Sequence, residues 1–297
     1  MLKKTREDII INVSGYIFII VFSALCLIPF ALIIAGSFTD ETTLIKYGYS
    51  LFPRKTSLLA YRLIFMDDSI FDAYKVTIIV TILGTFCSLV FTCAMAYALS
   101  VNSFKPRNKI AFFVYFTMLF SGGLVPSYLL ISKYLNLKNT LWVYIIPGLI
   151  NPYNMFLMRN FFKTIPESLS ESAKIDGAND VYILFKIVLP LSKPALATIG
   201  LFYALGYWNE WFTCVLYITD NKLISLQYLI MNVLREIDFM KELGKLQQTL
   251  AIQLEYIPPA FSGRMATAVV TIGPIIFAYP FVQKYFVKGL TVGSIKG

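Results

Sequence analysis

Six long apolar stretches limit what this chain can fold into more than any other feature of its sequence. Each is long enough to cross the roughly 30 Å hydrocarbon layer of a bilayer, which takes about 20 helical residues. Charged residues make up only 14% of the chain, against about 25% in a typical soluble domain. The sequence therefore predicts an all-α membrane protein with six transmembrane helices. The expected spans are Ile9–Phe38, Val76–Val101, Ile110–Ile131, Leu141–Phe162, Ala195–Ile218 and Met265–Val287.

The start of the chain has basic residues before an apolar run, as a signal peptide does. The run is too long for the apolar core of a signal peptide, and no A-x-A cleavage site follows it. We therefore expect a retained first helix. Lys and Arg in short loops favour the cytoplasmic side, and they gather at Lys3, Lys4, Arg6, Lys105, Arg107 and Lys109. This distribution predicts that both termini are cytoplasmic.

The same orientation divides the chain into regions. Residues 1–75 are expected to hold the N-terminal segment, the first helix and the first extracytoplasmic loop. Residues 76–287 form a five-helix core, with a cytoplasmic loop at 163–194 and an extracytoplasmic loop at 220–264. Within the latter, Leu226 to Glu242 can form an amphipathic helix. Residues 288–297 are a cytoplasmic tail.

Several chemical functions are excluded by missing residues. The chain has no histidine, no phosphate-binding GxxxxGK[ST] loop, no HExxH and no GxSxG. It is therefore not expected to be an enzyme or to hydrolyse nucleotide itself. The four cysteines lie in apolar stretches without a CxxC pair, so neither a disulfide framework nor a metal site is expected. Basic membrane loops explain the net charge of +9, and we expect no nucleic acid to bind.

The polar segment Pro166–Pro194 interrupts the apolar pattern but has the signals of an ordered structure. Pro166 and Glu167 are typical of a helix start, and Asp176-Gly177 of a helix end or turn. Asn179 or Asp180 can cap a second helix, which Pro190 would end. Its expected apolar face consists of Val181, Leu184, Phe185 and Val188. Such a helix–turn–helix favours a docking element; a passive hairpin at the bilayer surface is the alternative.

This segment resembles the EAA loop of inner-membrane permeases in binding-protein-dependent ABC importers. That loop reads E-A-A-x-x-(D)-G-A, followed by I-x-L-P. The chain departs from it at Ser172, where the small Ser replaces the usual Ala. The matching residues are Glu171, Ala173, Asp176, Gly177, Ala178, Ile187, Leu189 and Pro190.

Two further stretches narrow the resemblance. Trp208-Asn-Glu-Trp211 is similar to the W-N-E-[WFY] stretch of sugar permeases. The last residues, Phe286–Gly297, are similar to the tail of the smaller, maltose-permease-type subunit. The resemblance runs from Ile9 to Gly297 and is strongest to the polysaccharide and complex-oligosaccharide branch, the lipoprotein-C-like permeases.

The resemblance implies the type I ABC importer permease fold (MetI-like) in a bacterial cell membrane, surrounded by lipid. It implies half of a translocation pathway for a carbohydrate, completed by a second, different permease subunit. Further implied partners are two ATPase subunits, which bind ATP and Mg, and an extracytoplasmic solute-binding protein. No cofactor or metal is expected on this chain itself.

The resemblance also assigns residues to roles. Contact with the ATPase is expected at Glu171, Ser172, Ala173, Asp176, Gly177, Ala178, Leu189 and Pro190. The tail residues Gly293, Lys296 and Gly297 would reach the ATPase dimer interface, unless the terminus is simply frayed.

Sugars are held by aromatic faces and planar polar side chains, and the fourth and fifth spans carry both. The expected substrate path comprises Asn151, Tyr153, Asn154, Tyr207, Trp208, Asn209, Glu210 and Trp211. Pro147, Gly148 and Pro152 would break the fourth helix, and broken helices often line cavities. Interhelical packing is the alternative role for these aromatic residues.

Three other functions remain open on the sequence. A stand-alone secondary transporter needs intramembrane ionisable groups for ion coupling, and only Glu210 lies near the middle of a span. An ABC importer permease for a non-sugar solute would share the loop but not the saccharide. A membrane-anchored adaptor would need no solvent-filled path.

Overall fold

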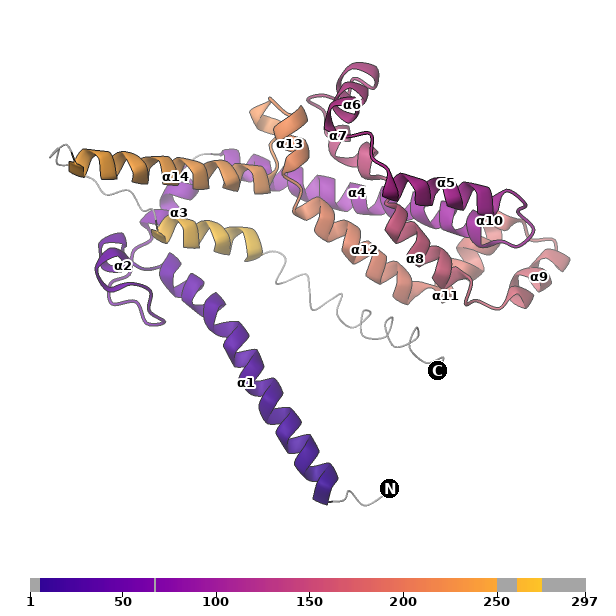
Figure 1. Cartoon of the computed structure of the whole chain (residues 1–297), viewed down its shortest axis with the longest axis horizontal. Coiled ribbons are helices and arrows are strands. Elements are labelled where there is room, and N and C mark those ends of the chain that lie inside the picture. Colours follow the sequence, from indigo (N-terminus) through magenta and orange to yellow (C-terminus); the bar gives the residue numbers. More distant parts are fainter. Residues whose placement is uncertain (1–5, 67, 250–260, 274–297) are drawn as a thin grey trace. The chain divides into compact units, whose positions relative to one another are not determined.

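The computed structural model describes residues 6–66, 68–249 and 261–273 of the chain. These residues are mostly helical and form two compact units, each described here by itself (Figure 1). The first unit contains residues 6–66, 230–249 and 261–273. The second contains residues 68–229 and holds the segments that the sequence analysis singled out.

The first unit consists of helices joined by irregular loops. Residues 261–273 are also helical. The named helices are α1 (Arg6–Ser37), α2 (Glu41–Tyr47), α3 (Leu59–Ile64) and the larger part of α14 (Leu226–Thr249). The α14 helix confirms the expected amphipathic helix and extends beyond it.

The second unit is built around α4 (Ser69–Ser100), the longest helix in it. The remaining elements in chain order are α5 (Arg107–Leu119), α6 (Leu124–Leu129), the π-helix η1 (Leu130–Tyr134), α7 (Trp142–Ile145), the 3₁₀ helix η2 (Ile146–Gly148), α8 (Pro152–Phe162), α9 (Glu167–Ile175), α10 (Asp180–Ile183), the π-helix η3 (Leu184–Val188), α11 (Leu189–Leu191), α12 (Lys193–Trp208), α13 (Phe212–Tyr217) and the 3₁₀ helix η4 (Asn221–Leu223). The first turns of α14 complete it.

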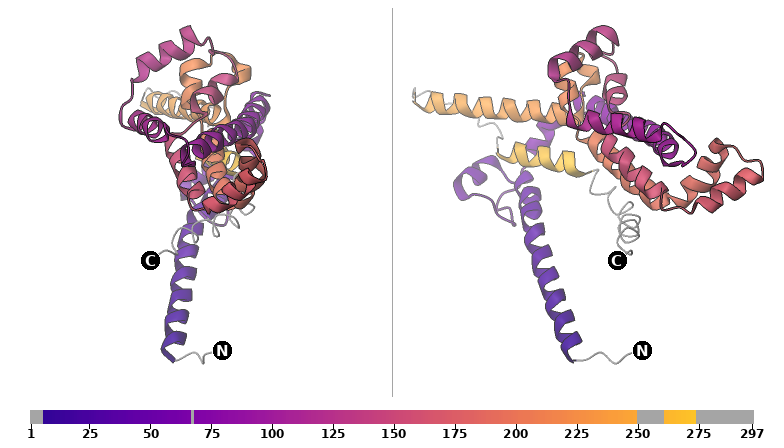
Figure 2. Two further views of the ribbon diagram at one scale, coloured as in Figure 1. Left: turned by 90° about the vertical axis from the view of Figure 1, so that its right-hand side faces the viewer. Right: turned by 45° about the vertical axis from the view of Figure 1, so that its right-hand side comes forward.

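The core of the second unit lies where α12 and α8 pack along α4, as Figures 1 and 2 show. Its fully buried large side chains include Leu99 of α4, Met155 and Met158 of α8, and Ile183 of α10. The α4 helix is apolar on all sides. One of its faces packs in this core, and Ile82 and Phe86 on α4 are exposed, where lipid can cover them. This is the pattern of a helix at the edge of a membrane bundle.

Hydroxyl groups connect these helices within the core. The Tyr207 hydroxyl on α12 lies 2.8 Å from the Ser88 hydroxyl on α4, and the Tyr203 hydroxyl lies 2.7 Å from that of Thr92. Tyr203 also accepts a hydrogen bond from the Asn151 backbone N–H at 3.0 Å. In lipid, such pairs satisfy polar groups that water cannot reach, so they fix the helices relative to one another.

Not every expected span forms one continuous helix. Among the described residues, Ile11–Ser37 and Ser69–Ser100 are long and apolar enough to cross a membrane. Two bent pairs also qualify if each counts as one span: Arg107–Leu119 with Leu124–Tyr134, and Asp180–Leu191 with Lys193–Trp208. The first pair bends by 112° and the second by 88°.

The breaks have local causes. The third expected span breaks at Gly123, whose φ of +86° favours glycine, just before Pro126 in α6. The fourth breaks between α7 and α8 at Pro147, Gly148 and Pro152, as the sequence predicted. The second half of the sixth expected span lies outside the described residues.

The expected apolar face of the second loop helix is wrong in part. Leu184 and Val188 are buried as expected, but Val181 and Phe185 are 65% and 54% exposed. The π-helical turn η3 changes the angular position of successive side chains, and Ile183 is buried instead. The helix ends at Leu191, one residue after Pro190, close to where the sequence predicts its end.

Candidate functional site

The loop between α8 and α12 forms an ordered helix–turn–helix. Helix α9 ends at Ile175, and Gly177 follows with a φ of +85°. The Gly177 N–H donates to the Lys174 carbonyl at 3.0 Å, and the Ala178 N–H donates to the Ala173 carbonyl at 2.9 Å. This pair of bonds is a Schellman motif, which requires a left-handed residue at the glycine position.

The second helix of the loop begins with a side-chain cap. The Asn179 side-chain oxygen accepts a hydrogen bond from the Tyr182 N–H at 2.8 Å. Asp180 then receives the Lys174 ammonium at 2.9 Å and the Tyr97 hydroxyl at 3.4 Å. The turn is therefore closed by an ion pair between its two helices and tied to the end of α4.

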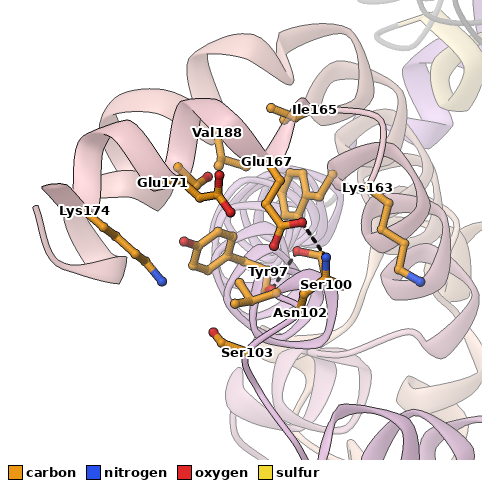
Figure 3. A pocket seen from close by; sticks show the side chains of 13 residues that line it. Tyr97, Ser100, Asn102, Ser103, Lys163, Ile165, Glu167, Glu171, Lys174 and Val188 are labelled. Carbon is orange, nitrogen blue, oxygen red and sulfur yellow. Dashed lines mark hydrogen bonds between the residues drawn. The ribbon is translucent and has the colours of Figure 1, made fainter.

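A cavity of about 310 Å³ lies beneath α9 (Figure 3). Its walls are the end of α4 with the following turn, the end of α8, and one side of α9. Both carboxylates and ammonium groups line this cavity. Its lining residues include Tyr97, Asn102, Lys163, Glu167, Glu171 and Lys174. Burial, together with the nearby Arg159 and Arg107, lowers the pKa of the Lys163 ammonium.

The contacts that seat α9 were not predicted from the sequence. The Asn102 amide donates to the Glu167 carboxylate at 2.6 Å, and the Arg107 guanidinium donates to the Asn102 side-chain oxygen. Asn102 thus joins α9 to the turn before α5. The sequence offered only a short basic turn at this position, with no signal for its partner 65 residues away.

The residues of the EAA-like pattern divide between two environments. Ala173, Ala178 and Leu189 are half-buried against the core of the unit, whereas Ser172, Asp176, Gly177 and Pro190 are exposed. Glu171 is exposed to solvent and lines the cavity beneath α9. Ala173, Ala178 and Leu189 therefore pack the turn against the core of the second unit.

Apolar side chains at the tip of the loop project into solvent. Ile175, the last residue of α9, is 86% exposed, and Tyr182 of α10 is 54% exposed. With Val181 and Phe185 they form a group that we call the tip cluster, defined as Ile175, Val181, Tyr182 and Phe185. A cluster of exposed large apolar residues on an ordered polar loop is typical of a protein-binding surface.

The expected substrate-path residues lie in different environments in the described part of the chain. Tyr207 and Trp208 are buried, and the Tyr207 ring packs where Gly84 leaves room for it. Asn151 caps α8 by accepting from the Asn154 N–H, and Asn154 itself is buried. Asn151 is exposed, and its backbone N–H also donates to the Tyr203 hydroxyl of α12. Tyr207 has the packing role that the sequence left open, and the place of all four residues on a substrate path stays a prediction.

The other four expected path residues are at least partly accessible. Asn209 is exposed, and its amide donates to the Leu205 carbonyl at the end of α12. Glu210 accepts from the Thr213 N–H at 2.8 Å and so caps α13 at a helix break, not within a continuous span. Trp211 is 43% exposed, and Tyr153 is 56% exposed on a groove between α5 and α8.

The cysteines differ in exposure, and Cys26 is exposed and Cys87 only partly buried, unlike the buried packing that the sequence predicts for all four. Cys26, Cys87, Cys93 and Cys214 are all free, and Cys93 and Cys214 are buried. The tail residues Gly293, Lys296 and Gly297 lie outside the described residues.

Comparison with known families identifies the chain. The model of the binding-protein-dependent transport system inner membrane component family matches residues 8–292. The chain belongs to this family. It is therefore an inner-membrane permease, a transport subunit that resembles its relatives over nearly its whole length.

One relative of the permease is named for the transport of polysaccharides. It is 43% identical to the "Polygalacturonan/rhamnogalacturonan transport system permease protein YtcP" of Bacillus subtilis (strain 168), over 95% of this chain and 96% of that one. It is 39% identical to "Protein LplC" of the same organism, over 100% of this chain and 98% of that one.

A solved structure has the same fold. It is a chain of a bacterial ABC transporter involved in the import of the acidic polysaccharide alginate, matched with a TM-score of 0.80 and 31% identity. The match covers 96% of this chain and 100% of that chain. The permease fold implied by the sequence resemblance is confirmed.

Proposed function

We propose that this permease forms half of the translocation pathway of an ATP-driven carbohydrate importer. The relatives support a saccharide substrate, since one is named for polygalacturonan and rhamnogalacturonan and another takes part in alginate import. In this proposal the chain crosses the membrane six times, with both termini in the cytoplasm. Its partners are a second permease, two ATPase subunits and an extracytoplasmic binding protein.

The observation that carries the proposal is the ordered loop with the exposed tip cluster. An apolar cluster costs little to bury against a partner, because its helix–turn–helix scaffold is already folded. The loop is closed by the Schellman motif and the Lys174–Asp180 ion pair, so force on the tip reaches α8 and α12 through packed helices. This suits a surface on which a nucleotide-driven ATPase pushes.

The permease supplies docking and a path, and ATP chemistry belongs to the partner ATPases. In this scheme ATP and Mg bind only to those subunits. Closure of the ATPase dimer moves the loop between α8 and α12, and these two helices move with it. Because both helices pack on α4, the three helices move together. The pathway would then open alternately to the two sides of the membrane.

The test replaces one residue of the tip cluster. Ile175→Glu places a charge where the ATPase surface should be apolar, and we expect loss of ATPase co-purification and of ATP-dependent saccharide uptake in proteoliposomes. Phe52→Glu is the matched control, because Phe52 is 83% exposed in the expected outer loop. Normal ATPase binding by Ile175→Glu would contradict the docking role of the loop.

A further inference from the structure

The loop between α8 and α12, residues 163–192, is called the docking loop below. A groove between α5 and α8 is separate from the cavity beneath α9 of this loop. Its volume is about 520 Å³, within the roughly 300–1,000 Å³ of small-molecule sites. One wall comes from α5 and the other from α8, where the Tyr115 and Phe156 rings meet edge to face at 6.4 Å between centroids. The groove runs toward the end of α8 that leads into the docking loop.

The groove alternates aromatic rings with polar groups. Phe112 and Tyr153 present rings that are 69% and 56% exposed, one from each wall. Asn108 of α5 and Asn160 of α8 add amide groups that both donate and accept hydrogen bonds. Sugar rings need both features, since their apolar faces stack on aromatic rings while their hydroxyls pair with amides. An acyl chain would gain nothing from the amides.

One charged group lines the groove. Arg159 stands among these residues, and none of the other lining residues is acidic. Its Nε donates to the Leu99 carbonyl near the end of α4 at 2.9 Å, which fixes the guanidinium plane. A guanidinium held at Nε still presents its Nη groups, and these can pair with a carboxylate through two parallel hydrogen bonds.

From these features we propose that the groove binds a carboxylate-bearing sugar unit, a uronate, on its way through the permease. Arg159 pairs with the carboxylate, and the aromatic walls hold the ring. Arg159 thus selects acidic over neutral saccharides. This inference rests on the proposed function, because it places a subsite for the same carbohydrate on the path between the two permeases.

The experiment compares a charged and a neutral substrate in the complete importer. Proteoliposomes would contain this permease, its partner permease, the ATPases and the binding protein, and uptake of a galacturonate trisaccharide and of its methyl ester would be measured. Arg159→Gln should lower uptake of the acid about tenfold and of the ester less than about twofold, since a charge-assisted pair is lost. Arg159→Lys should give an intermediate loss of the acid, because it keeps the charge but not the fork. The binding protein's own preference cancels in the ratio of variant to parent.

Controls distinguish a uronate subsite from a purely structural role of Arg159 and from a lipid site. Lys105→Gln removes the same charge from an exposed turn outside the groove and should leave the acid-to-ester ratio unchanged.

Equal loss of both substrates in Arg159→Gln would show a structural role only and overturn the proposal, as would unchanged uptake of the acid. A ratio that changes only when the vesicles contain anionic lipid would assign the groove to a lipid headgroup instead. A parent complex that imports the ester but not the acid would overturn the uronate subsite and leave the proposed function intact.

Discussion

At the scale of single residues, Gly177 and Gly84 show two different reasons why a position requires glycine. Gly177 has space around it, but its φ of +85° is a conformation that other residues adopt at a cost. Gly84 is helical, and a Cβ there would lie 2.7–2.9 Å from atoms of the Tyr207 ring. The first is required by the backbone and the second by packing.

Gly177→Val should weaken the docking loop. The β-branched side chain opposes the left-handed conformation, and we expect a cost of about 1–2 kcal/mol that unwinds the Schellman motif. ATPase co-purification and stimulated uptake should fall, while membrane insertion stays normal. Gly177→Asn is the control, since Asn tolerates this conformation. Equal activity of the two variants would show that the turn geometry does not matter for docking.

Gly84→Ala should destabilise the packing of α4 on α12. The rigid Tyr207 ring must move to admit one methyl group, and we expect a loss of about 1–3 kcal/mol in the free energy of unfolding. Thermal unfolding in detergent measures it. Gly206→Ala is the matched control, because nothing lies within 4 Å of its added Cβ. Restoration of stability by adding Tyr207→Leu would confirm the cause, and a Gly84→Ala protein as stable as the parent would exclude it.

At the scale of elements, the helical residues 261–273 are held by a residue far away in the sequence. The buried Glu41 carboxylate of α2 accepts hydrogen bonds from the Phe261 N–H at 2.8 Å, the Ser262 N–H at 2.9 Å and the Ser262 hydroxyl at 2.7 Å. The first N–H groups of a helix lack internal partners, and a carboxylate there is also favoured by the helix dipole. Glu41 thus caps a helix 220 residues away.

Glu41→Ala should therefore loosen this helix start. The loss of a buried charged acceptor leaves N–H donors unpaired, and we expect a cost of about 2–4 kcal/mol, with faster amide exchange at the beginning of this helix. Glu236→Ala is the control, since that change removes the same charge from an exposed position on α14. Unchanged amide exchange at residues 261–264 would contradict the capping role.

At the scale of the whole molecule, the sites depend on which side of the membrane each loop faces. The docking loop must lie in the cytoplasm to bind the ATPases, and the Lys and Arg residues in short segments predict that it does. Between Ile11 and Phe30, α1 exposes its apolar side chains, which is expected for a helix in contact with lipid.

Single cysteines test this topology. In a variant without the four native cysteines, Ser50→Cys should react with a membrane-impermeant thiol reagent in intact cells, because it lies in the expected outer loop. Ser103→Cys and Ser172→Cys should react only after the membrane is opened. All three positions are exposed in the structure, so differences in labelling report the side of the membrane. The reverse labelling pattern would place the docking loop outside.

The sequence by itself determined that the chain is built from apolar helices, the turn at Gly177, a cap at Asn179 or Asp180, and the break between α7 and α8. These follow from local backbone preferences and from the hydropathy of short windows, which neighbouring residues decide. It also carried the family resemblance in Glu171, Gly177 and Pro190.

Only the tertiary structure decided which side chains face a cavity and which face another helix. Tyr207 and Tyr153 look alike as aromatic residues in broken spans, yet Tyr207 fills the space left by Gly84 and Tyr153 lines a groove. The same holds for Glu41 and Arg159, whose partners are remote in sequence. Such roles depend on contacts between segments that are distant in the sequence. In the second loop helix, the burial pattern also depends on the change in angular position that a π-helical turn introduces. Neither can be predicted from a local sequence pattern.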